Sequence, residues 1–126
     1  MKFRMMGLAL GLLAFTAPAH AEGDAAKGEQ VFKKCMACHS ATDATNKVGP
    51  SLHGVVGRKA ASVEGYKYSP AMTKKAEEGL VWDEATLAEY LPKPMAFVPG
   101  TKMAFAGLAK PEDVENVIAY LKTQSQ

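Results

Sequence analysis

The stretch Cys35-Met36-Ala37-Cys38-His39 decides how the rest of this 126-residue chain is interpreted. Its spacing, C-x-x-C-H, is the attachment signature of c-type haem. Two thiols three residues apart share one side of a helical turn, so both can face a porphyrin edge and add to its vinyl groups. The histidine that follows can reach the iron from one side. The motif therefore predicts one covalent haem c, attached through Cys35 and Cys38 and ligated by His39.

Two other interpretations of the cysteines are weaker, a redox dithiol and half of a zinc site. A thioredoxin-like dithiol belongs in a βαβ context, which this sequence lacks. A zinc site needs four ligands, usually from further cysteines or paired histidines. Beyond residue 21 the chain offers only Cys35, Cys38, His39 and His53. Haem attachment is therefore favoured.

The first 21 residues are typical of a secretory signal peptide. Lys2 and Arg4 give a positive start, residues 7–17 are apolar, and Ala19-His20-Ala21 is a small-residue cleavage site. The apolar run is shorter than the roughly 17–25 residues of a membrane span. We therefore expect a signal peptide over residues 1–21, one domain over residues 22–126, and export to the periplasm, with no stable membrane insertion after cleavage.

Charge and size limit the remaining possibilities. The chain has 15 Lys and Arg against 13 Asp and Glu, so loss of Lys2 and Arg4 would leave equal numbers. Nucleic acid binding has no support, because there is neither a basic excess nor an aromatic and basic stripe. A domain this small buries limited apolar area, and a covalent macrocycle would enlarge its core. We expect a monomer whose haem-free chain is largely unfolded.

The sequence beyond the motif predicts short helices separated by long loops, and hence an all-α fold. Capping residues and prolines mark the helix starts. The predicted helices run from Asp24 to about Cys38, from Ser69-Pro70 to Glu77, from Asp83 to about Leu91, and from Pro111 onward. The last has an apolar stripe of Val114, Val117, Ile118 and Leu121. Segments 40–65 and 92–107 lack a period and are predicted loops, and no alternating strand is evident. Gly28 weakens the first helix, which indicates the close approach of another helix.

The second axial ligand of the iron has several candidates: Met36, Met72, Met95, Met103, His53 and lysine. Met36 is tied between the cysteines and cannot cross the ring. Met72 lies in a predicted helix, where methionine is more often ordinary core. A lone loop histidine such as His53 is usually a surface or hydrogen-bonding residue. Met103 follows a turn that can present a side chain inward, so these arguments favour it and leave Met95 and His53 open.

Several separated stretches are similar to the class I c-type cytochromes, the family of mitochondrial cytochrome c and its soluble bacterial relatives. They follow family-like order and spacing along residues 22–126. The matching stretches are Gly28-x-x-x-Phe32, Cys35 to His39, Val48 to Gly54, Gly57-Arg58, Tyr66-Lys67-Tyr68, Trp82, Tyr90-Leu91, Pro99 to Gly107 and Ile118 to Lys122. The resemblance implies the small cytochrome c fold, with short helices and long loops wrapped around one covalently bound haem.

The resemblance also implies roles for individual residues. Met103 would be the distal ligand opposite His39, whose second ring nitrogen would donate to the Pro50 carbonyl and tune the ligand. Tyr90 would place its hydroxyl near the Met103 sulfur. The other implied haem contacts are Arg58, Tyr68 and Trp82 around a propionate, Thr101 on the same side, and Phe105 over the haem edge.

A histidine and a methionine ligand together leave no open coordination position, and methionine raises the reduction potential. Both points favour a one-electron carrier over the rival classes, a haem peroxidase, a dithiol oxidoreductase or a gas sensor. The implied role is a soluble periplasmic shuttle, not an enzyme, between membrane complexes. Examples are a quinol:cytochrome c oxidoreductase as donor and a terminal oxidase, photosynthetic reaction centre or periplasmic reductase as acceptor. We expect Lys34, Lys47 and Lys102, which adjoin the haem-binding stretches, to steer transient docking to acidic patches.

Overall fold

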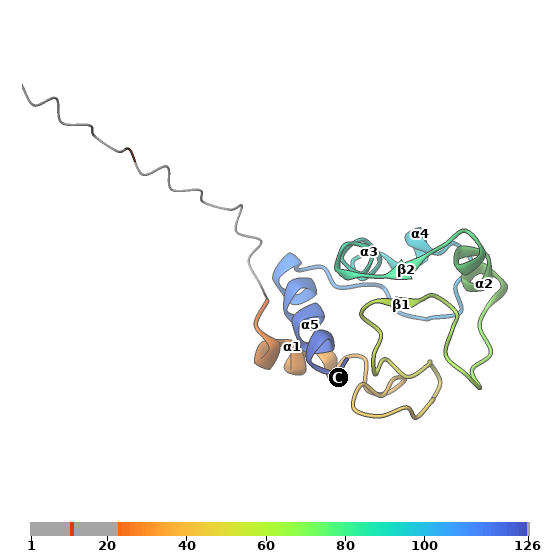
Figure 1. Cartoon of the computed structure of the whole chain (residues 1–126), viewed down its shortest axis with the longest axis horizontal. Coiled ribbons are helices and arrows are strands. Elements are labelled where there is room, and N and C mark those ends of the chain that lie inside the picture. The colour runs from red at the N-terminus through yellow and green to blue at the C-terminus, as the bar shows by residue number, and fades with distance from the viewer. Residues whose placement is uncertain (1–10, 12–22, 126) are drawn as a thin grey trace, which may run out of the picture.

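The computed structural model describes residue 11 and residues 23–125. The predicted signal peptide and its cleavage point lie outside the described residues, apart from residue 11. The elements are α1 (Ala25–Phe32), β1 (Arg58–Lys59), α2 (Pro70–Glu77), β2 (Val81–Trp82), α3 (Glu84–Tyr90), α4 (Pro94–Phe97) and α5 (Pro111–Thr123). Figure 1 shows α1 and α5 crossing at the left of the molecule, α3 and α4 along its upper middle and α2 at the right. Short helices and long loops predominate, which confirms the all-α class.

The first and last helices, α1 and α5, pack closely where Gly28 meets Asn116 (Figure 1). A Cβ atom at residue 28 would lie 1.9 Å from the Asn116 carbonyl oxygen, so only glycine fits the crossing. The ring centroids of Phe32 and Tyr120 lie 5.4 Å apart beside it. The close approach predicted from Gly28 is thus confirmed. The predicted apolar stripe of α5 is buried in the core: Val114, Val117, Ile118 and Leu121.

Three helices begin at the capping residues that the sequence indicates. The side chains of Asp24, Ser69 and Asp83 each accept a hydrogen bond from the backbone N–H three residues further on, at 3.0, 3.1 and 2.8 Å respectively. These bonds satisfy N–H groups that a helix leaves unpaired at its start. Thr86 completes a reciprocal capping box, because its hydroxyl oxygen accepts from the Asp83 N–H at 3.0 Å. Pro111 begins α5 as predicted.

The first helix is shorter than predicted, since α1 ends at Phe32 and not near Cys38. The N–H groups of residues 33, 34 and 35 bond to carbonyls three residues back, which is the tighter pattern that often ends a helix. The turn continues through the motif, where the N–H groups of Cys38 and His39 both bond to the Cys35 carbonyl, at 3.1 and 2.9 Å. The two cysteines therefore still share one turn.

The structure also has elements that the sequence did not predict. The segment 92–107, expected to be all loop, contains α4, which starts at Pro94. Proline is well tolerated at a first helical position, because the N–H that it lacks would be unpaired there anyway. Strands β1 and β2 pair antiparallel, with Arg58 opposite Trp82 and Lys59 opposite Val81. Two residues are too few to leave an alternating pattern in a sequence.

Candidate functional site

His39 is held at one fixed orientation by the segment that follows it. Its Nδ1 lies 2.7 Å from the Pro50 carbonyl oxygen. A carbonyl only accepts hydrogen bonds, so Nδ1 carries the proton and Nε2 keeps its lone pair. Burial lowers the pKa of His39 and the Arg58 charge adds to this, while the bond to Pro50 opposes them. The imidazole is thus kept neutral, the form that ligates metals.

Gly49 lies directly against the His39 ring, a contact that the sequence analysis did not single out. A Cβ atom at residue 49 would come within 2.3 Å of His39 Cε1. The only sequence signal was the Val48-Gly49-Pro50 stretch in the family resemblance. Gly49 itself is buried, so the backbone of residues 49 and 50 forms one wall of the imidazole site.

Cys35 and Cys38 are both free, half-buried thiols on the turn after α1. Burial raises the pKa of the Cys35 thiol, and the neighbouring Cys38 adds to the increase, while Lys34 opposes it. Disulfide chemistry requires the thiolate. The raised pKa therefore disfavours the thiolate form of Cys35.

Met103 is half-buried against the core, and a buried hydroxyl contacts its sulfur. The Tyr90 hydroxyl, at the end of α3, lies 3.4 Å from Met103 Sδ. Burial raises the pKa of Tyr90 to about 12, so the phenol keeps its proton and can donate to the sulfur. The Met103 N–H in turn donates to Thr101 Oγ1 at 3.2 Å. Thr101 therefore supports the segment that carries Met103.

Arg58 points its guanidinium group into the loop that follows the C-x-x-C-H motif. Its Nη1 and Nη2 donate to the carbonyl oxygens of His53 and Ser51 at 3.2 and 3.0 Å. Its Nε is buried and has no hydrogen-bond partner among the described residues. Burial lowers the pKa of Arg58, and Tyr68 opposes this shift. A buried guanidinium N–H without a partner is costly, and a carboxylate would satisfy it.

The remaining predicted haem contacts are Trp82, Tyr68 and Phe105. Trp82 lies opposite Arg58 in the β1–β2 pair, and its ring centroid is 4.7 Å from that of Tyr90. The Tyr68 hydroxyl oxygen accepts from the Val63 N–H at 3.0 Å, so its role is partly structural. Phe105 is half-buried and packs against the core. The structure adds an aromatic residue that sequence analysis missed, Phe97 on α4, whose ring centroid lies 6.2 Å from that of Trp82 and 5.8 Å from that of Tyr90.

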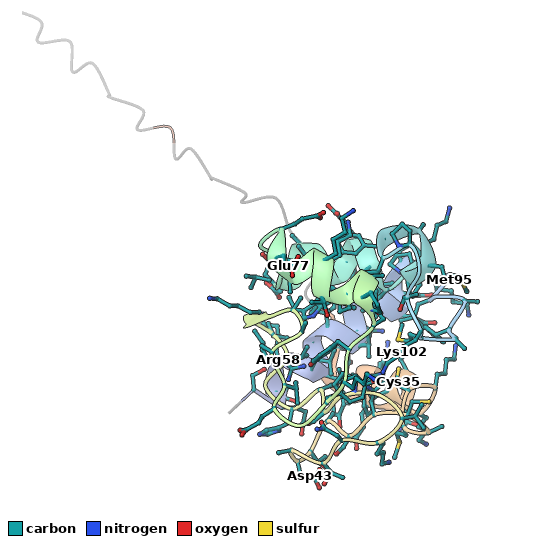
Figure 2. The ribbon with its side chains drawn as sticks, turned by 90° about the vertical axis from the view of Figure 1, so that its right-hand side faces the viewer. Cys35, Asp43, Arg58, Glu77, Met95 and Lys102 are labelled. Carbon is teal, nitrogen blue, oxygen red and sulfur yellow. The ribbon has the colours of Figure 1, made fainter. Side chains whose placement is uncertain are left out.

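The three lysines expected to steer docking are all exposed. Lys47 Nζ donates to the Met36 carbonyl at 3.0 Å, which joins it to the C-x-x-C-H turn. Lys102 Nζ donates to the Lys67 carbonyl and lies 4.5 Å from the Tyr66 ring centroid. Figure 2 shows Lys102 toward the middle of the molecule, with the acidic residues Glu77 and Asp43 away from it toward opposite ends. Positive charge is therefore fixed beside the motif and beside the Met103 segment.

The donor set of this region suits a haem with a covalent anchor. It offers two thiols on one turn, a neutral imidazole with a free Nε2, a thioether sulfur and an unpaired buried guanidinium N–H. Imidazole and thioether are the usual protein ligands of c-type haem iron, and a haem propionate is the kind of anion that could accept from Arg58 Nε.

Within residues 23–125, no group of three or more His, Cys, Asp or Glu side chains gathers to hold a metal ion. Nor is any helix there long and apolar enough to cross a membrane.

Comparison with known proteins identifies the family. A family model described as Cytochrome c matches residues 25–125. A cytochrome c2 of Rhodomicrobium vannielii is 52% identical over 124 residues, covering 98% of this chain and 94% of the relative. A cytochrome c2 of Agrobacterium tumefaciens is also 52% identical, over 101 residues that cover 79% of this chain and 91% of the relative.

Solved structures agree with this match. Cytochrome c2 from Rhodospirillum centenum superposes with a TM-score of 0.78 at 42% identity, covering 82% of this chain and all of the other. Cytochrome cH from Methylobacterium extorquens gives a TM-score of 0.74 at 50% identity, covering 80% and 99% respectively. The chain therefore belongs to the cytochrome c family, and is an electron-transfer protein, not an enzyme, that binds haem c covalently.

Proposed function

We propose that this protein is a periplasmic one-electron carrier whose iron is ligated by His39 Nε2 on one side and Met103 Sδ on the other. Thioethers from Cys35 and Cys38 would hold the haem. The observation that carries the choice of Met103 is its hydrogen bond from the buried Tyr90 hydroxyl, at 3.4 Å. Such a contact orients a thioether ligand and tunes its donor strength.

The other candidates for the second ligand are less suitable. Met36 and Met95 are 52% and 57% exposed, so solvent would compete at either sulfur. Met72 lies within α2, where it packs against the core. His53 is tied to the chain segment that directly follows His39, because its Nδ1 lies 3.0 Å from the Ala41 carbonyl oxygen; this bond leaves Nε2 free, so His53 is the alternative that the spectra must test. Burial and hydrogen bonding together thus favour Met103.

The bound haem supplies reversible exchange of one electron between ferric and ferrous iron. The protein's own residues would then decide which chemistry is allowed. With His39 and Met103 both bound, no coordination position is open to oxygen or peroxide, and a thioether ligand favours a high reduction potential. Because Pro50, Gly49 and Tyr90 fix the two ligand side chains, little movement is needed between the two oxidation states. These features suit a carrier better than a peroxidase or a gas sensor.

An optical spectrum of the haem protein tests the ligation. Sulfur ligation predicts a weak far-red band in the ferric form and little carbon monoxide binding in the ferrous form. Met103→Ala should abolish the band and open the iron to carbon monoxide, whereas Met95→Ala and His53→Ala should leave the spectrum unchanged. Loss of the band in Met95→Ala or His53→Ala, but not in Met103→Ala, would assign the ligand elsewhere.

We further propose that Lys34, Lys47 and Lys102 steer the monomer into transient complexes with acidic patches on membrane redox complexes. Candidate donors and acceptors are a quinol:cytochrome c oxidoreductase and a terminal oxidase, photosynthetic reaction centre or periplasmic reductase. Transient electron-transfer interfaces are small, and steering by charge raises their association rates. The bonds of Lys47 and Lys102 to backbone carbonyls support this role, because they hold both charges near the haem-binding segments.

Stopped-flow electron transfer from an isolated quinol-oxidising complex, or to an isolated oxidase, tests the docking. The second-order rate constant should fall as ionic strength rises, because salt screens exposed charges. Lys47→Gln and Lys102→Gln should lower the rate at low salt, while Lys110→Gln, ahead of α5, should leave it near that of the wild type. A second-order rate constant that does not change with ionic strength, in the wild type or in any variant, would contradict electrostatic docking.

Export is the last part of the proposal. Its support is the positive start at Lys2 and Arg4, the short apolar run and the cleavage site Ala19-His20-Ala21. Removal of residues 1–21 would leave a domain over residues 22–126 that acts in the periplasm. N-terminal sequencing of the periplasmic haem protein should give Glu22 as the first residue. A retained Met1 in a membrane fraction would refute cleavage.

A further inference from the structure

Three aromatic side chains from three elements form one contact group beside the Met103 sulfur. We call this group, Trp82 of β2, Tyr90 of α3 and Phe97 of α4, the aromatic cluster. The ring centroids of Trp82 and Tyr90 lie 4.7 Å apart, those of Tyr90 and Phe97 5.8 Å, and those of Trp82 and Phe97 6.2 Å. The Tyr90–Phe97 pair is T-shaped, an arrangement that aromatic rings prefer because the edge of one meets the face of the other.

Phe97 connects this cluster to the segment that carries Met103. Its N–H bonds to the Lys93 carbonyl at 3.1 Å as part of α4. The next residue, Val98, is fully buried, and its carbonyl accepts from the Thr101 N–H at 3.0 Å. Thr101 Oγ1 then accepts from the Met103 N–H at 3.2 Å. A short chain of bonded residues therefore links the Phe97 backbone to the methionine.

A second contact holds the Phe97 ring from α2. The Lys75 ammonium lies 5.5 Å from the centroid of that ring, within the range of a cation–π interaction. Phe97 is thus placed by its own helix, by two aromatic neighbours and by a cation. Phe97 contacts Tyr90 and lies in the same chain segment as Met103, whose sulfur accepts a hydrogen bond from the Tyr90 hydroxyl.

We infer that Phe97 is a positioning residue for the iron site, acting through Tyr90. This inference rests on the proposed ligation by Met103. A tyrosine hydroxyl donates to sulfur only when its ring is held at the right angle, and the T-shaped contact with Phe97 supplies that restraint. The O–H dipole presents its positive end to Met103 Sδ and so favours the reduced, less positive iron. Loss of the Phe97 ring should therefore lower the reduction potential without touching either ligand.

The test compares holoprotein variants by reduction potential and by the far-red band of the ferric form. Phe97→Leu, which keeps an apolar side chain but removes the ring, should lower the potential and weaken the band. Phe97→Tyr, which keeps the ring, should retain the wild-type values of both. Tyr90→Phe should lower the potential at least as much as Phe97→Leu. The double variant should show no further loss beyond Tyr90→Phe, because both changes remove the same interaction.

A control separates positioning from a general loss of stability. Val117→Ala truncates a buried side chain of α5 and should lower the melting temperature while leaving the potential and the band unchanged. The inference is overturned if Phe97→Leu behaves like Val117→Ala, or if its effect adds fully to that of Tyr90→Phe. A Met103→Ala variant that keeps the far-red band would instead refute the proposed ligation, so the two failures are distinguishable.

Discussion

The α-carbon of Gly49 and the imidazole of His39 occupy adjoining space with no room for another atom. A Cβ atom at residue 49 would stand 2.3 Å from His39 Cε1, 2.7 Å from Nδ1 and 2.8 Å from Nε2. All three distances are shorter than any normal van der Waals contact. Glycine at residue 49 is therefore a requirement of the ring and of the hydrogen bond that the ring makes to Pro50.

Gly49→Ala should directly disturb His39, the proposed proximal ligand. The added methyl group must push the His39 ring away from the Pro50 carbonyl or move the backbone of the loop. Overpacking of this kind costs about 1–3 kcal/mol of unfolding free energy. Denaturant unfolding of the holoprotein should show that loss, and the optical spectrum should change with it because the imidazole is displaced.

A matched control is available in the same loop. Gly54 has a φ of +75°, and a Cβ atom there would have no neighbour within 4 Å, so alanine at residue 54 is strained but makes no clash. Gly54→Ala should cost roughly 1–2 kcal/mol through the left-handed conformation and leave the spectrum unaltered. An unaltered spectrum in Gly49→Ala as well would mean that the ring adjusts without consequence.

Arg58→Gln should lower both the stability and the reduction potential of the holoprotein. The guanidinium donates to the carbonyls of Ser51 and His53, and hydrogen bonds to charged groups contribute about 1.5–3 kcal/mol. Loss of its positive charge should also make the ferric state easier to reach. Denaturant unfolding and a redox titration measure the two effects.

Lys59→Gln is the control for the charge change, because Lys59 is the exposed neighbour on β1. A surface substitution of this kind usually stays within about 0.5 kcal/mol of the wild type. If Lys59→Gln shifts the potential as much as Arg58→Gln does, the effect is one of overall charge and not of the buried guanidinium.

Much of the helical framework could be predicted from the sequence, because its signals are local. Asp24, Ser69 and Asp83 cap helices through bonds to groups three residues away, and a local rule identifies such residues. The predicted end of α1 was wrong because the hydrogen bonds after Phe32 change to the i to i−3 pattern that leads into the turn of the haem motif. Helix propensity does not predict such a change. Helix α4 was missed because segment 92–107 lacks a helical period, and a helix of four residues is too short to show one.

The details of the site depend on contacts that no local pattern encodes. Gly49 touches His39 ten residues away, and the pairing of Arg58 with Trp82 joins segments 24 residues apart. Phe97 acquires its place only when α3 and α4 fold together. The family resemblance identified Tyr90 as a candidate site residue. Phe97 could be identified only from the structure, because its proposed role depends on the side chains that it contacts.

Asp83 should make the stability of the protein depend on acid pH. Hydrogen bonds from the backbone N–H and the hydroxyl of Thr86 lower the pKa of the Asp83 carboxyl from its usual 3.8. The stabilisation is fully present above that ordinary value, and it is lost as the pH falls through the lower native value. Asp83→Asn keeps an acceptor oxygen but cannot titrate there. Melting curves should therefore show the advantage of the wild type over Asp83→Asn shrinking in that acid range, and a constant difference at all pH values would contradict the cap.

Removal of the covalent haem should leave the chain largely unfolded. Residues 40–57 and 98–110 contain no helix or strand, and ordering each backbone residue costs about 1–2 kcal/mol. So much loop in a small domain needs apolar surface to pack against, which the macrocycle provides. The double variant Cys35→Ala and Cys38→Ala, prepared without haem, should lose most of its helical circular dichroism and melt without a cooperative transition.

Met103→Ala is the control, because it keeps both thioethers and should stay folded. Comparison of the double variant with Met103→Ala therefore separates the effect of haem burial from that of iron ligation. A cooperative transition with native helix content in the haem-free double variant would show instead that the α1–α5 crossing and the core suffice on their own.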